Sequence, residues 1–130
     1  MIEPVWLSAE TIIYINEEVV RETDEPFFLL DRGLLESAVA KTSNHFHYDG
    51  VEDVVSLATT LLFGVARNHP FVQGNKRTGF LAAVVFLEIN GYTIEADASR
   101  DLAPSIIYVL ERRLTEKQFA DMLWTVVREI

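Results

Sequence analysis

The chain has 130 residues, of which 49% are hydrophobic and none is cysteine, and its formal net charge is −9. This length predicts one domain, residues 1–130, built around one core. The lack of cysteine excludes disulfides and thiolate metal sites and favours a reducing, cytoplasmic location. The acidic balance argues against direct binding of nucleic acid or of membranes. The N-terminus lacks the regions of a signal peptide, and the longest apolar run, 79–87, is too short to span a bilayer.

The first third of the chain predicts two helices joined by a turn. Ser8 is the expected N-cap of a helix that ends near Arg21, and residues 23–26 form the turn. Asp31 then caps a second helix over 33–41, where apolar residues recur at helical spacing.

Residues 42–50 alternate without helical spacing and end in the turn signal Asp49-Gly50. An exposed loop accounts for this pattern. A metal site on His45 and His47 is the alternative, although nothing nearby completes a set of ligands.

Two strongly apolar helices follow. The first begins at Asp49 or Gly50 and reaches Asn68, with apolar residues at steps of one, three and four. The second begins near Asn75 and runs over 76–89 with little polar face, so we expect other elements to surround it. The pair Asn90-Gly91 ends it.

The C-terminal third predicts a short extended piece at 93–94 and then a helix capped by Asp97 or Ser99. Pro104 is tolerable in that helix only within the first turn.

A last helix begins with Thr115 and Gln118, which have the spacing of a capping box. Its apolar residues are Phe119, Met122, Leu123, Val126 and Val127. We expect Trp124 in the core. The chain as a whole predicts an all-α fold of five or six helices with little strand.

Residues 69–77, His-Pro-Phe-Val-Gln-Gly-Asn-Lys-Arg, connect the two apolar helices. The first N–H groups of the second helix have no intrahelical partners, and the helix dipole adds about half a positive charge there. Gly74 lets a phosphate approach the backbone, and Lys76 and Arg77 add two cations. Phe71 is expected to point inward and anchor the loop. The pattern predicts a polyanion site.

His69 lies across this loop, in a place to exchange a proton. A histidine on an apolar helix face is usually a core residue, but His69 stands at a helix end beside Pro70 and the anion site. The loop holds no serine–histidine–acid arrangement and no His/Cys cluster. The residues alone therefore predict a phosphate-binding loop with a histidine base.

The loop resembles the signature of the Fic/Doc (Fido) family, His-x-Phe-x-(acidic)-(Gly/Ala)-Asn-(Gly/Lys)-Arg. The matching positions are His69, Phe71, Gly74, Asn75, Lys76 and Arg77. Lys76 stands where Fic adenylyltransferases have glycine, so the chain is more similar to the Doc branch, the death-on-curing toxins of toxin–antitoxin systems. Arg67 and Thr78 also resemble that branch.

This resemblance implies a compact Fido-type helical bundle with a short β-like flap. In the family the flap holds a target segment in extended form, and an open strand edge can do so by main-chain pairing. Residues 42–50 are the region of this chain that resembles the flap, which adds a third interpretation of that segment.

The resemblance also implies the reaction. Fic proteins transfer AMP from ATP to a target hydroxyl. Doc-like proteins bind ATP in the reversed orientation and transfer its γ-phosphate. Elongation factor Tu is the target associated with the Doc branch, and its modification inhibits translation. His69 is then the general base, while Gly74, Asn75 and the loop amides hold phosphate oxygens. Lys76 and Arg77 neutralise phosphate charge in the transition state.

Gln73 departs from the family pattern, because the family usually has Asp or Glu there to hold Mg²⁺. An amide oxygen can coordinate magnesium but lacks the carboxylate charge. A catalytically weakened nucleotide-binding homologue is therefore one alternative to a kinase, and AMP transfer of the Fic type is another. Arg67 is a second-tier candidate for contact with nucleotide or target.

Fic proteins often carry an inhibitory helix that resembles (Ser/Thr)-x-x-x-Glu-(Gly/Asn). Thr125 and Glu129 have this spacing, but Ile130 follows them. We therefore expect restraint by a separate antitoxin, which for Doc relatives is a small, partly disordered protein of the prevent-host-death type.

Overall fold

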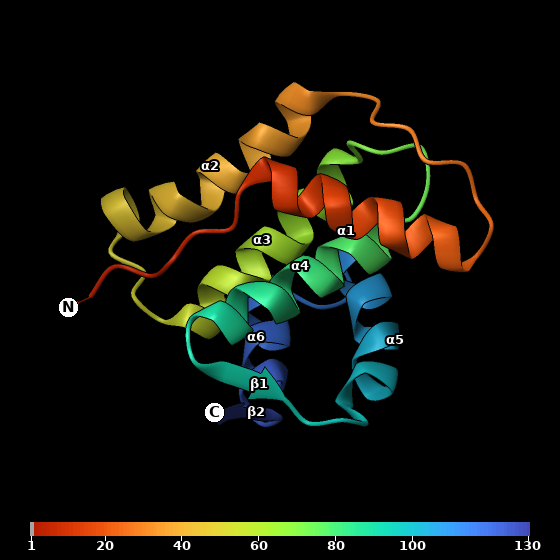
Figure 1. The fold of residues 1–130 in the computed structure, drawn as a ribbon. Coiled ribbons are helices and arrows are strands. Elements are labelled where there is room, and N and C mark those ends of the chain that lie inside the picture. The colour runs from red at the N-terminus through yellow and green to blue at the C-terminus, as the bar shows by residue number, and fades with distance from the viewer. Residues whose placement is uncertain (1) are drawn as a thin grey trace.

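The computed structural model describes residues 2–130, and within that range it forms six α-helices and two short strands (Figure 1). The helices are α1 (Ala9–Glu22), α2 (Arg32–Asp49), α3 (Val54–Asn68), α4 (Asn75–Ile89), α5 (Ala98–Leu110) and α6 (Glu116–Trp124). The strands are β1 (Tyr92–Ile94) and β2 (Val127–Glu129), which pair antiparallel. The predicted all-α fold is confirmed.

Helices α3 and α4 form the centre of the molecule (Figure 1). Helix α3 packs against α2, α4 and α6, and α4 also packs against α1. Fully buried aromatic rings from three helices meet in this core, and Phe63 and Phe119 contact each other edge to face at 5.2 Å. The two central helices approach closely at Gly79, where an added Cβ would lie 2.7 Å from the Leu62 carbonyl oxygen.

Side-chain caps start three of the helices at the predicted places. Ser8, Asp31 and Thr115 each accept a hydrogen bond from a backbone N–H three residues on, in α1, α2 and α6. Gln118 completes the capping box of α6 by accepting from the Thr115 N–H at 2.9 Å. These caps satisfy donors that the helix itself cannot pair.

Residues 42–49 are helical, so all three interpretations of the segment 42–50 are wrong. These residues form the last two turns of α2, and Gly50 follows as its C-cap with φ 71°. Ala38, Thr42 and Phe46 recur every four residues and turn inward, which is a helical spacing. His45 lies 2.9 Å from Asp49, and His47 faces Glu3 at 3.6 Å.

Helix α3 begins later than predicted, because Gly50 belongs to the end of α2 and Asp53 is the actual N-cap. The Asp53 carboxylate accepts from the Val55 N–H at 3.0 Å and from the Ser56 hydroxyl at 2.7 Å. It also accepts from the Trp124 indole N–H at 3.0 Å. Trp124 is 43% exposed and lies outside the core, contrary to prediction.

Two further expectations about the C-terminal third are wrong. Pro104 lies in the interior of α5 and not in its first turn. The carbonyl that loses its partner belongs to the exposed Arg100, where water can replace the N–H. The last helix stops at Trp124, and Val127 pairs with Ile94 in the small sheet.

None of the helices within residues 2–130 combines the length and hydropathy that a membrane crossing needs.

Candidate active site

Side chains of the loop between α3 and α4 anchor this loop to the core and fix its backbone. Phe71 is fully buried, as predicted. The Asn75 side chain clamps the Phe71 backbone, because its Nδ2 donates to the Phe71 carbonyl at 2.8 Å and its Oδ1 accepts from the Phe71 N–H at 3.0 Å. His69 caps the end of α3 in the left-handed conformation, with φ 53°. This backbone turn carries the chain out of the helix and leaves His69 exposed.

An extended segment, residues 26–31, lies beside this loop at the upper right of Figure 1. Leu29 forms an antiparallel bridge with Phe71. The Val72 N–H donates to the Phe28 carbonyl at 3.0 Å, and the Leu30 N–H donates to the Pro70 carbonyl at 2.8 Å. The extended element next to the loop therefore precedes α2 and is not the segment 42–50.

The start of α4 leaves a row of backbone donors free. Gly74 is the N-cap, with φ 76° and no side-chain cap. Among residues 2–130, no group accepts from the N–H of Gly74, Asn75, Lys76 or Arg77. Such a row of unpaired N–H groups at the positive end of a helix dipole favours an anion.

These donors, His69 and the two cations surround one cavity of about 300 Å³. Its lining consists of Ala66, His69, Val72, Gln73, Gly74, Asn75, Lys76, Arg77 and Leu110. The structure thus brings together all the predicted motif residues except the buried anchor Phe71. His69, Lys76 and Arg77 are exposed, so their side chains are accessible to a ligand.

The two cations of the loop differ in their surroundings. The Arg77 guanidinium donates to the Glu25 carboxylate at 2.5 Å and to the Thr23 hydroxyl at 3.2 Å. Hydrogen bonds from the Thr23 hydroxyl and from Arg77 hold the pKa of Glu25 below its usual value of 4.5. Lys76 has no acidic partner within 4.0 Å among residues 2–130.

Two predicted ligand contacts are changed by this geometry. Both ends of the Asn75 side chain are committed to Phe71, so only its backbone N–H is free for a phosphate. Arg67 does not line the cavity. Its guanidinium lies 3.4 Å from Glu116 of α6 and over the Phe63 ring, so its predicted contact with nucleotide has no support in this geometry.

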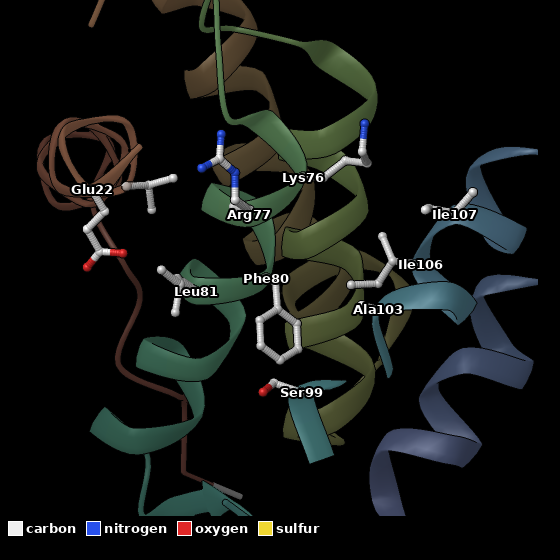
Figure 2. Close-up of a pocket in the computed structure, with 10 residues that line it drawn as sticks. Glu22, Lys76, Arg77, Phe80, Leu81, Ser99, Ala103, Ile106 and Ile107 are labelled. Carbon is white, nitrogen blue, oxygen red and sulfur yellow. The ribbon is translucent and has the colours of Figure 1, made fainter. Parts of the chain in front are cut away.

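A second cavity, of about 420 Å³, adjoins the first, because Lys76 and Arg77 line both. Figure 2 shows its walls, formed by Glu22 of α1, Phe80 and Leu81 of α4, and Ile106 and Ile107 of α5. Leu81, on the helix that we expected other elements to surround, is 40% exposed because it faces this cavity. The loop cations therefore stand between the first cavity and a second, more apolar one.

The donor set for a metal ion is poor. Within residues 2–130, no three His, Asp or Glu side chains come together as metal ligands. Gln73 offers one neutral amide oxygen to the first cavity, whereas Mg²⁺ usually takes one or two carboxylates together with substrate phosphates. The protein side of the site therefore does not by itself fit a resident magnesium ion.

Two residues near the site were not found from the sequence. Asn16 of α1 is fully buried and donates to the Gln73 carbonyl, and Glu25 pairs with Arg77. Asn16 carried a signal, because it is a polar residue at helical spacing from the apolar Ile12 and Val20. Glu25 carried none, because its partner lies 52 residues away in the sequence.

The six-helix fold and the loop from His69 to Arg77 define a helical protein of the Fido class. The family model described as Fic/DOC family matches residues 6–87. The match covers more than half of the chain, and the chain belongs to this family.

Two curated relatives are similar to the chain. Toxin Doc of Mycolicibacterium smegmatis is 41% identical over 78 residues, which cover 59% of this chain and 60% of that protein. Protein kinase doc of Escherichia phage P1 is 25% identical over 117 residues, which cover 90% of this chain and 91% of that protein.

Proposed function

We propose that this protein is a Doc-like toxin that transfers the γ-phosphate of ATP to a hydroxyl group of a target protein. The observation that carries the proposal is the first cavity, where His69 shares one space with four free backbone N–H groups and two cations. The names of the two curated relatives, a toxin and a protein kinase, support the same assignment.

The residues have separate roles in this proposal. His69 accepts the proton of the target hydroxyl. The hydroxyl oxygen forms a bond to the γ-phosphorus, the bond from that phosphorus to the β-phosphate oxygen breaks, and ADP leaves. The N–H groups of residues 74–77 hold phosphate oxygens, and Lys76 and Arg77 neutralise the charge that shifts to the leaving ADP.

Magnesium belongs to the substrate in this proposal and enters with ATP. The phosphate oxygens would supply its charged ligands, and Gln73 would be the loop residue that holds it, through a neutral amide oxygen.

The target segment binds along residues 26–31. Because Phe28 and Leu30 use their main-chain groups toward the loop, the N–H and C=O of Leu29 face the opposite edge. An extended peptide can pair with that edge, and the exposed side chains of Phe27 and Phe28 give it apolar contact. We propose a target that resembles elongation factor Tu, inhibition of translation in the cytoplasm, and restraint by a small antitoxin of the prevent-host-death type.

Labelled ATP tests the reaction. The protein is incubated with bacterial lysate and ATP that carries the label on either the α- or the γ-phosphate. Label from the γ position on a lysate protein is the expected result. Label from the α position overturns the kinase and indicates AMP transfer. ATP binding without any transfer overturns catalysis and indicates a nucleotide-binding homologue weakened at Gln73.

A further inference from the structure

Asn16 is a polar side chain in an apolar place. It lies on the buried face of α1 with 0% exposure, between Ile12 and Val20. An amide that loses water without gaining partners costs free energy, so a buried asparagine in this position needs partners to be tolerated.

The partners of Asn16 belong to the anion-binding loop. Its Nδ2 donates to the Gln73 carbonyl at 2.8 Å and to the Thr78 hydroxyl at 3.0 Å. These acceptors stand on either side of the row of free N–H groups, one just before Gly74 and the other one turn into α4. Helix α1 lies so close that a Cβ on Gly74 would be 3.4 Å from the Asn16 Nδ2.

The contact with Gln73 sets the direction of the next peptide group. In a trans peptide, the carbonyl and the following N–H point in opposite directions. Because Asn16 draws the Gln73 carbonyl toward α1, the Gly74 N–H points away from α1. Gly74 lines the first cavity and Asn16 does not, so this orientation directs the Gly74 donor toward the anion site.

The other end of the amide supports a functional role. Asn16 Oδ1 is buried without a hydrogen-bond partner among residues 2–130. An apolar side chain of similar volume would avoid this unpaired oxygen. Asparagine at this position therefore costs free energy through its unpaired Oδ1. It provides in return the Nδ2 donor, and both acceptors of that donor are at the loop.

We propose that Asn16 is a positioning residue that fixes the anion-binding loop in its phosphate-binding conformation. This inference rests on the proposed function, because it assumes that the loop binds the phosphates of ATP. Asn16 acts through the Gln73–Gly74 peptide and does not touch the ligand.

Inorganic tripolyphosphate is the probe, since it reports on the loop without the base or ribose of ATP. Isothermal titration compares the wild type with Asn16→Leu, which keeps the number and branching of the side-chain heavy atoms and removes the donor. Ile12→Val is the matched control, because it removes a methyl group from the same buried face of α1 and leaves the loop contacts intact. We expect binding about tenfold weaker for Asn16→Leu and unchanged for Ile12→Val.

A kinetic readout separates positioning from general loss of structure. In the γ-label assay, Asn16→Leu should raise the KM for ATP by more than it lowers kcat, because it weakens phosphate binding and leaves His69 in place. A loss confined to kcat with normal KM contradicts the proposal.

The outcomes distinguish this proposal from the one it rests on. If the wild type binds tripolyphosphate and Asn16→Leu binds it equally well, Asn16 is not a positioning residue. If the wild type does not bind it, the proposed anion site fails and the role of Asn16 fails with it.

Should Asn16→Leu not fold, nitrogen-15 NMR of the wild type replaces it. The Asn16 side-chain amide and the Gly74 backbone amide should then shift with one midpoint during the tripolyphosphate titration. A Gly74 response without an Asn16 response overturns the proposal.

Discussion

The guanidinium of Arg77 and the carboxylate of Glu25 lie 2.5 Å apart, and this pair joins the first turn of α4 to the chain that follows α1. Arg77 also lines both cavities. An arginine has five donors, so one carboxylate does not use them all. Glu25 nevertheless offsets positive charge at the place where we propose that a phosphate binds. The Glu25 carboxylate and the phosphate therefore compete for Arg77.

Glu25→Gln should therefore strengthen the binding of ATP. An ion pair this exposed is weak, so we expect a gain of at most about fivefold in affinity. Isothermal titration with a non-hydrolysable ATP analogue measures the change. Glu22→Gln is the matched control, because it removes the same charge from α1 and Glu22 has no ion pair with Arg77. Weaker binding by Glu25→Gln would show that Glu25 holds Arg77 in place for the ligand.

Gln73→Asp should tighten the binding of Mg²⁺ in the presence of the same ATP analogue, by about tenfold, because a carboxylate adds the charge that this cation favours. Gln73 is exposed, so the fold should tolerate the change. Gln73→Asn introduces a side chain of the same shape as Asp but without its charge, and it should leave the affinity for Mg²⁺ unchanged. If titration detects no difference between the Asp and Asn variants, residue 73 is not at the metal.

The parts of the site that the sequence predicted are those encoded by neighbouring residues. The loop, the helix start at Asn75 and the inward Phe71 all follow from glycine, proline and apolar spacing within nine residues. The caps at Ser8 and Thr115 follow from rules that span three residues. Such local signals need no knowledge of the packing.

The parts that the sequence did not predict depend on contacts between distant elements. Arg67 looked like a ligand contact because it is close to His69 in the chain, but its guanidinium forms an ion pair with Glu116 of α6. The segment 42–50 looked like an extended flap, yet packing of Thr42 and Phe46 keeps it helical. The segment beside the loop was found only from its bridge with Phe71.

Gly79→Ala should destabilise the protein by about 1–3 kcal/mol, the usual cost of overpacking a core. Its Cβ would lie 2.7 Å from the Leu62 carbonyl oxygen, and a backbone atom cannot rotate away. Chemical unfolding measures the loss. Gly33→Ala, in the exposed first turn of α2, meets only the Asp31 side chain and should be close to neutral. Equal stability of the two variants would contradict the close packing of α3 on α4.

The ion pair between Glu10 and Arg32 predicts a pH dependence of stability. The hydrogen bond from Arg32 lowers the pKa of Glu10 below its usual value of 4.5. A lowered pKa in the folded state means that the ionised carboxylate stabilises the fold above pH 4.5, and that this contribution is lost as the pH falls further. Thermal unfolding below that pH should show a smaller decline in Tm for Glu10→Gln than for the wild type. Parallel curves for the two proteins would contradict the pair.

The most direct test of the account compares His69→Ala with the wild type. It measures how fast each protein transfers label from γ-labelled ATP to a lysate protein. The wild type should transfer the label, and His69→Ala should lose at least about a hundredfold of the rate, as expected when a general base is removed. His47→Ala is the control, because His47 lies on α2 beside Glu3 and should retain full activity. If His69→Ala transfers the label as fast as the wild type, the proposed chemistry of this loop is wrong.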